Sequence, residues 1–192
     1  VQRKSAIGEP YIELTQPSRS GAGVLKDGDR VVFEQAAIAL YLADKFPEAG
    51  LGAAVDDPMR GSLLTMLAYY CGVMEPAFMS KCMQMQVPRG SAAWVDSDEA
   101  MDFINARLAS QPYIAGERFT LADPLYAAAF AMFMDSPLLS SQRTPQLEQY
   151  VQRCISRPAF ARAREKDVTR DSLRRLVAAL SLFPFPFSLR ES

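Results

Sequence analysis

The sequence changes from a strand-like segment to a helical one between Phe33 and Glu34, and this change constrains the fold more than any other feature. Residues 30–33 are typical of a β-strand, and they run directly into residues 34–44, whose apolar side chains recur at helical spacing. A strand that feeds a helix leaves backbone N–H groups open at the positive end of the helix dipole. Such a junction favours an anionic group. We therefore expect a carboxylate site here, with Glu34 placed to accept an ammonium group of the same ligand.

The remaining pattern divides the chain into a small α/β part and a larger all-helical part. Short strand-like segments and glycines alternate before Glu34, whereas almost every later segment has helical periodicity. Pro47 and Gly50 end the first helix. We predict an α/β part over residues 1–47, a linker over 48–56, an all-helical domain over 57–167 and a C-terminal extension over 168–192. The extension either docks on its own helical domain or meets a partner chain.

Local capping signals predict where the helices of the second part begin. Helix starts are indicated at Asp57-Pro58, Asp96, Thr144-Pro145 and Pro158. The first of these helices is long, and Pro76 should bend it because proline removes a backbone donor.

Thr120 and Asp123 form the sharpest of these signals, a capping box ahead of an apolar run. In such a box the threonine side chain accepts a hydrogen bond from the Asp123 N–H, and the aspartate carboxylate accepts one from the Thr120 N–H. We expect both residues to be structural.

Composition excludes several classes of function. The net charge is −1 and the basic residues are scattered, so the sequence indicates no basic surface for nucleic acid. No apolar run reaches the length of a membrane span. The first residues lack the order of a signal peptide, so we expect a cytoplasmic protein. The chain has no histidine, which excludes Ser-His-Asp and Cys-His catalysis and a His-ligated metal. Cys71, Cys82 and Cys154 are predicted to be buried thiols without a disulfide or a metal.

Three motifs resemble the glutathione transferase family. They are residues 34–50, residues 113–124 and the Arg-Pro-Ala-Phe sequence at 157–160. The likeness extends from about Val24 to Asp167. It implies a thioredoxin-like part that holds glutathione, followed by a helical-bundle domain that holds much of the electrophile site. It also implies that the functional unit is a homodimer.

The resemblance assigns roles to four residues near the first helix. Glu34 and Gln35 stand where the family has an acidic-Ser pair that grips the γ-glutamyl end of glutathione. Gln35 keeps an amide donor in place of the serine hydroxyl. Ala22 and Gly23 fall near the family's Val-Pro turn, where a cis proline orients backbone bonding to the cysteinyl unit.

The long helix from Asp57 is the one that faces the electrophile pocket in the family. Tyr70, Met74 and Phe78 lie on it and would line a pocket for small apolar molecules, or they only pack in the core. Both interpretations remain open at this stage.

The first part of the chain departs from the family pattern. Residues 1–10 match only the end of the family's first helix, ahead of which the family carries its catalytic Tyr, Ser or Cys. Residues 15–23 are too few for the helix that the family places between its second and third strands. The sequence therefore identifies no catalytic residue. It favours a glutathione transferase that conjugates glutathione to apolar electrophiles, or else a catalytically silent binding or scaffold protein of the same fold.

Overall fold

The computed structural model describes residues 13–15 and 23–166 of the 192 residues. The chain divides into two compact units, residues 1–154 and residues 155–192. The first unit contains a small sheet and most of the helices, and the described part of the second unit contains α7 (Pro158–Lys166). This is an α/β part followed by a helical part, as the sequence predicts.

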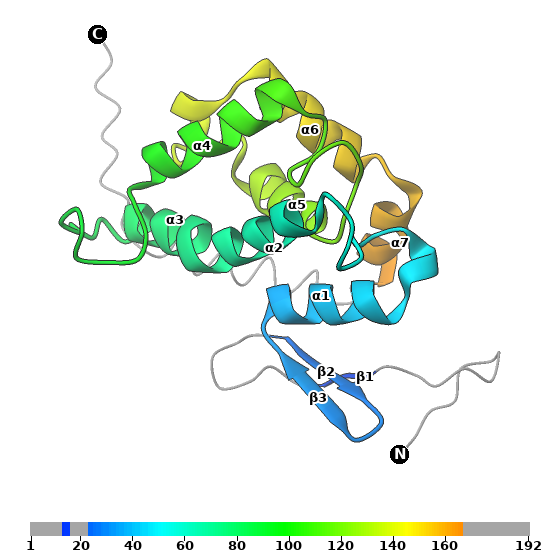
Figure 1. The fold of residues 1–192 in the computed structure, drawn as a ribbon. Coiled ribbons are helices and arrows are strands. Elements are labelled where there is room, and N and C mark those ends of the chain that lie inside the picture. The colour runs from blue at the N-terminus through cyan, green and yellow to red at the C-terminus, as the bar shows by residue number, and fades with distance from the viewer. Residues whose placement is uncertain (1–12, 16–22, 167–192) are drawn as a thin grey trace, which may run out of the picture. The chain divides into compact units, whose positions relative to one another are not determined.

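A three-stranded antiparallel sheet forms the first part of the chain (Figure 1). Its strands β1 (Glu13–Thr15), β2 (Val24–Asp27) and β3 (Arg30–Phe33) lie in the order β1-β2-β3. Asp27 pairs with Arg30 across the hairpin, and Gly28 adopts a φ of 61° there, which favours glycine. The predicted strand at residues 31–33 is confirmed.

Helix α1 (Gln35–Lys45) follows β3 directly and contacts both the sheet and the long helix of the same unit. Its buried residues are the small Ala39 and Ala43, whereas the larger Ile38, Tyr41 and Leu42 are only half-buried. The short helix η1 (Pro47–Ala49) and Gly50, with a φ of 65°, then end the segment. The apolar stripe of α1 is therefore incompletely covered.

The long predicted helix is a continuous run of three segments. It consists of α2 (Arg60–Tyr69), the π-helical segment η2 (Tyr70–Met74) and α3 (Glu75–Cys82). Pro76 lies just after the π-helical turns, where the wider hydrogen-bonding register accommodates the missing proline donor. The predicted start at Asp57-Pro58 is two residues early: the Asp57 carboxylate accepts the Met59 N–H (2.8 Å), the Asp57 carbonyl oxygen accepts the Arg60 N–H (2.8 Å), and the helix begins at Arg60.

Three further helices complete the described part of the first unit. They are α4 (Ser97–Ser110), α5 (Asp123–Phe133) and α6 (Pro145–Ile155), with the short η3 (Ser140–Gln142) between the last two. Asp96 caps α4 by accepting the N–H groups of Asp98 and Glu99 at 2.9 Å, and the Thr144 hydroxyl accepts the Leu147 N–H at 3.1 Å. The predicted starts of α4, α6 and α7 are confirmed.

The core of the helical part is built around α5, whose residues Tyr126, Ala127 and Phe130 have no exposed surface. The Tyr126 hydroxyl donates a hydrogen bond of 2.8 Å to the Met66 carbonyl oxygen, which fastens α5 to α2. Because this donor is buried, its hydrogen bond removes the cost of an unsatisfied polar group.

Thr120 and Asp123 are fully buried at the start of α5. The Asp123 carboxylate accepts hydrogen bonds from the Thr120 N–H (2.7 Å), the Thr120 hydroxyl (3.1 Å) and the Ile114 N–H (2.9 Å). The expected bond from the Asp123 N–H to the threonine hydroxyl is absent from this pair, because the hydroxyl donates to the carboxylate and the Asp123 N–H donates to the Thr120 carbonyl (3.1 Å).

Candidate functional site

Glu34 occupies the N-cap of α1 in a strained backbone conformation. Its φ is 66° and its ψ is 135°, and only Gln84 shares a positive φ among the described non-glycine residues. A side chain in this region costs about 1 to 3 kcal/mol, and such residues persist where the surrounding structure enforces them, often at ligand sites. The Glu34 side chain is exposed and makes no capping hydrogen bond to its own helix. It is therefore available to a ligand.

The first turn of α1 presents open backbone donors. The Ile38 N–H makes the first bond of the helix, to the Glu34 carbonyl oxygen at 2.9 Å. The N–H groups of Gln35, Ala36 and Ala37 consequently have no partner inside the helix, and that of Ala36 bonds the Cys71 sulfur instead. The first turn also contains no acidic side chain that would offset the positive end of the helix dipole.

Cys71 and Glu75 form the opposite wall, on the long helix. They are four residues apart, so they lie on the same side of that helix, and both are half-buried. The Glu75 carboxylate is hydrogen-bonded by the side chains of Tyr70 and Gln35. Burial raises the pKa of Glu75, and the negative charge of Glu34 raises it further, against the effect of the two hydrogen bonds. We call Glu34, Gln35, Cys71 and Glu75 the end-group cluster.

The Cys71 thiol also faces the start of α1. Burial raises its pKa, as do the charges of Glu75 and Glu34, and a hydrogen bond from the Ala36 N–H only partly opposes them. The sulfur is thus protonated at neutral pH, and a protonated thiol is a poor nucleophile. A carboxylate is a stronger acceptor than this thiol, so it could displace the sulfur from the Ala36 N–H and also accept from the N–H groups of Gln35 and Ala37.

The two carboxylates of the end-group cluster have no cationic partner in the part of the chain that the structure describes. Neither Glu34 nor Glu75 forms an ion pair with a described lysine or arginine. Two neighbouring carboxylates repel each other, and an ammonium group placed between them would relieve that repulsion. Together with the open N–H groups, they suit a ligand end that carries both a carboxylate and an ammonium group.

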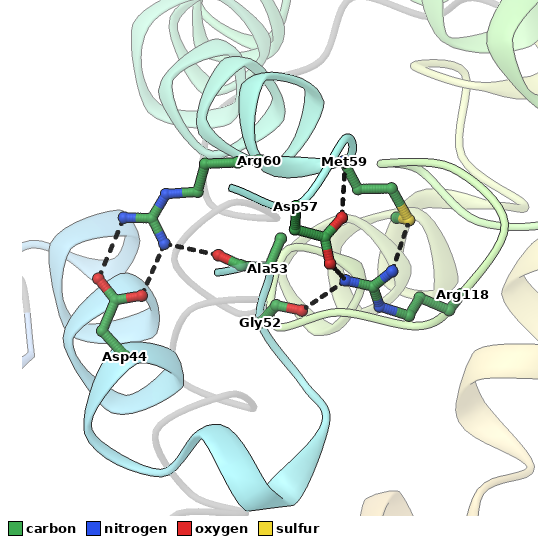
Figure 2. A network of polar contacts seen from close by, with 7 residues as sticks. All are labelled: Asp44, Gly52, Ala53, Asp57, Met59, Arg60 and Arg118. Atoms are coloured by element: carbon green, nitrogen blue, oxygen red, sulfur yellow. Dashed lines mark hydrogen bonds and ion pairs between the residues drawn. The ribbon is translucent and has the colours of Figure 1, made fainter. Parts of the chain in front are cut away.

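The other end of α1 is held by ion pairs. Arg60 grips Asp44 with two hydrogen bonds (2.6 and 3.1 Å) and donates a third to the Ala53 carbonyl oxygen (2.8 Å), as Figure 2 shows. Arg60 lowers the pKa of Asp44 through the hydrogen bond and the charge. On the sheet side, the buried Asp27 accepts a hydrogen bond of 2.5 Å from the Tyr41 hydroxyl and pairs with Lys45.

Arg118 fastens the segment between α1 and α2 to the rest of the first unit. It pairs with Asp57 and donates to the Gly52 carbonyl oxygen (3.2 Å) and to the Met59 sulfur (3.2 Å) (Figure 2). The sequence motif at 113–124 contains Arg118, but nothing in the motif indicates that its partners lie about sixty residues earlier.

Comparison with known proteins gives one consistent result. Residues 70–158 match the family model described as the C-terminal domain of glutathione S-transferase. Glutathione S-transferase F14 of Arabidopsis thaliana is 27% identical over 154 residues, which are 71% of this chain and 60% of the relative. Glutathione S-transferase 3 of Zea mays is 29% identical over 175 residues, 85% of this chain and 73% of the relative.

Solved structures give the same result. A sphingomonad glutathione S-transferase complexed with glutathione superimposes with a TM-score of 0.58 at 24% identity, over 84% of this chain and 80% of that chain. The theta class enzyme of Xanthomonas axonopodis pv. citri with glutathione bound gives 0.57 at 25% identity, over 73% and 70%. The family model, the relatives and the solved structures all point to the glutathione transferase family. It spans 60% of the length of the Arabidopsis relative and 79% of that of the Hyoscyamus muticus glutathione S-transferase.

Of the residues to which the family resemblance assigns glutathione contacts, Glu34 and Gln35 lie in the end-group cluster. Gly23 is exposed just before β2, and Ala22 lies outside the described residues. The assignment of Ala22 and Gly23 to glutathione stays a prediction. The sequence does not indicate that Cys71 and Glu75 lie at this site; their spacing of four residues places them on one helix face but not against α1.

The residues predicted for an electrophile pocket are nearly enclosed. Tyr70, Met74 and Phe78 keep 6%, 1% and 5% of their surface exposed. The Tyr70 ring packs edge-on against Tyr126 with centroids 5.0 Å apart, and Phe78 meets the rings of Phe130 and Phe133. The alternative of a packing role accounts for this burial, and a role in the pocket of a glutathione transferase stays a prediction.

Residues 13–15 and 23–166 contain no cluster of three or more cysteine or acidic side chains that could hold a metal ion. No helix in these ranges is both long enough and apolar enough to cross a bilayer. None of the three cysteines is in a disulfide. Cys154 is buried as predicted, and Cys71 and Cys82 are half-buried.

Proposed function

We propose that the protein binds glutathione by its γ-glutamyl end at the start of α1 and transfers it to apolar electrophiles. The observation that carries the proposal is the strained N-cap Glu34 beside open N–H groups and opposite Glu75. The family relationship supports glutathione as the ligand, since related structures are described as complexes with it. Conjugation to apolar electrophiles is inferred from the family alone.

In this proposal the two charged groups of the γ-glutamyl end separate between the two walls of the site. The α-carboxylate accepts hydrogen bonds from the open N–H groups at the start of α1, where the helix dipole also favours it. The ammonium group lies toward the carboxylates of the end-group cluster. Gln35 contributes its side-chain amide, which Glu75 holds in place.

Calorimetric titration with glutathione tests this binding mode. Glu34→Ala should weaken binding by about 1.5 kcal/mol, roughly tenfold in Kd, because one charge-assisted contact at an exposed position is lost. Glu117→Ala is the matched control, since Glu117 is also exposed but lies outside the cluster, and it should bind like the wild type. Equal affinity of the wild type and Glu34→Ala would refute the assignment.

A catalytically silent glutathione-binding or scaffold protein is the second candidate. Burial raises the pKa of both Tyr70 and Cys71, so neither group provides the low-pKa donor that would stabilise a glutathione thiolate. A conjugation assay with an activated chloronitrobenzene separates the two candidates in a protein that binds glutathione. Turnover above the rate of free glutathione supports the transferase, and binding without turnover supports the silent protein.

A further inference from the structure

A cavity lies away from the end-group cluster, between the end of α3 and the start of α4. Its volume is about 1020 Å³, and it is lined by the C-terminal half of α3, the loop of residues 84–95 and the first turn of α4. Figure 1 shows this loop extending beyond the ends of both helices. Cavities of this size are typical of sites for small molecules.

This cavity and the end-group cluster use opposite sides of α3. Successive helical residues turn by about 100°, so Ala77, Ser80 and Lys81, which line the cavity, are centred on the face opposite Glu75. The first site faces α1 and the second faces α4. A ligand in the cavity would therefore leave the glutathione site open.

Side-chain bonds span the cavity and hold the loop to both helices. Trp94 Nε1 donates to the Ser80 hydroxyl at 3.2 Å, Lys81 pairs with Asp98 at 2.8 Å, and Arg89 pairs with Glu99 at 3.1 Å. The three elements that line the cavity are thus joined to one another by side-chain contacts.

These same bonds indicate that the cavity favours an uncharged ligand. Both of its basic side chains are paired with acidic ones, and Asp96 accepts two N–H groups of α4. Every lining charge thus already has a partner, so the cavity holds no unpaired charge that would attract an oppositely charged ligand. The neutral amides of Gln84 and Gln86 remain as hydrogen-bonding groups.

Apolar groups form the rest of the lining. The Trp94 N–H is bonded to Ser80, so the indole contributes its apolar ring to the lining. Val87 and Val95 also line the cavity and are half-buried. Met85, 51% exposed, adds a flexible side chain that adapts to ligands of different shape. We propose that this cavity binds one uncharged molecule with a flat apolar ring that packs on Trp94 and a polar substituent that bonds Gln84 or Gln86.

The single tryptophan of the chain makes the test direct. The full chain is titrated with N-phenyl-1-naphthylamine, an uncharged aromatic dye, while Trp94 emission is followed. Saturable quenching with one dye per chain is expected. Ala93→Phe places a ring in the cavity and should weaken dye binding by about tenfold or more, whereas Ala106→Phe, on an exposed part of α4, should bind like the wild type.

Circular dichroism confirms that both variants are folded before their affinities are compared. Excess glutathione should leave the dye affinity unchanged, and the anionic dye 8-anilinonaphthalene-1-sulfonate should bind more weakly than the uncharged one. Absence of saturable quenching would overturn the proposal. Equal dye affinity of Ala93→Phe and Ala106→Phe, or tighter binding of the anionic dye than of the uncharged one, would overturn it as well. None of these outcomes depends on whether glutathione binds at α1.

Discussion

At the scale of single residues, Glu34 is the position where stability and binding are in conflict. A glutamate with a φ of 66° is strained, whereas glycine adopts this conformation without a steric cost. We predict that Glu34→Gly raises the free energy of unfolding by about 1 kcal/mol, even after the greater entropy of glycine in the unfolded chain, and weakens glutathione binding.

Urea denaturation and calorimetry measure the two effects separately. Gln84→Gly is the control, because Gln84 has a φ of 53° but lies outside the end-group cluster. It should stabilise the protein and leave the affinity for glutathione unchanged. If Glu34→Gly retained full affinity, the strain at Glu34 would have no connection with glutathione.

The sequence reveals only part of this site, because its two walls are joined by tertiary contacts. Glu34 and Gln35 stand at a strand-to-helix junction, which is a local pattern that can be recognised without a structure. The positive φ of Glu34 has no such signal, since glutamate rarely adopts it. Glu75 is about forty residues from Gln35, and only the folded chain shows that the two side chains are hydrogen-bonded.

At the scale of the elements, α1 is fixed at its C-terminal end while its N-terminal end stays open. The Asp44–Arg60 pair joins α1 to α2, and Asp27 joins it to β2. Because a helix is stiff, fixing one end also orients the N–H groups at the other end. The pairs around Asp44 therefore support the geometry of the proposed glutathione site.

The Asp44–Arg60 pair predicts a pH dependence of stability. The hydrogen bond from Arg60 holds the pKa of Asp44 below its ordinary value of 3.8, so the folded state favours the carboxylate. This stabilisation is present above pH 3.8 and is lost as the pH falls through the lower pKa of the folded state. Asp44→Asn should thus lower Tm by about 1 to 3 °C at neutral pH, and the difference from the wild type should shrink below pH 3.8.

Thermal unfolding followed by circular dichroism at several pH values measures this difference. Asp102→Asn, at an exposed position on α4, should leave Tm unchanged throughout. A Tm difference for Asp44→Asn that persisted unchanged at low pH would contradict the electrostatic origin.

Element boundaries could be predicted where the signal is local. Asp96 and Thr144 mark helix starts through contacts with the next two or three residues, and Pro158 does so through its fixed φ. The structure has α4, α6 and α7 at these places. Asp57 gives the same signal, but its carboxylate caps a turn and also pairs with Arg118, so the helix starts later. The π-helical turns before Pro76 depend on packing that the sequence pattern does not contain.

At the scale of the whole molecule, apolar surface on the first part of the chain favours assembly. On β3, Val31 and Phe33 are 49% and 51% exposed, and Phe46 after α1 is 38% exposed. The stripe of α1 is half-buried as well. Surface of this kind is characteristic of protein interfaces.

The last prediction is that the protein is a homodimer in which this surface meets a second copy of the chain. A stable two-fold interface should bury at least about 1,200 Å² in total and persist at micromolar concentration. Light scattering should then give twice the chain mass of 21.2 kDa. Val31→Asp places an unpaired charge in the interface and should shift the protein to the monomer. Val55→Asp, at a position that is 87% exposed and away from β3, should remain dimeric. A wild-type mass of one chain at these concentrations would contradict the dimer, and equal masses for the two variants would place the interface elsewhere.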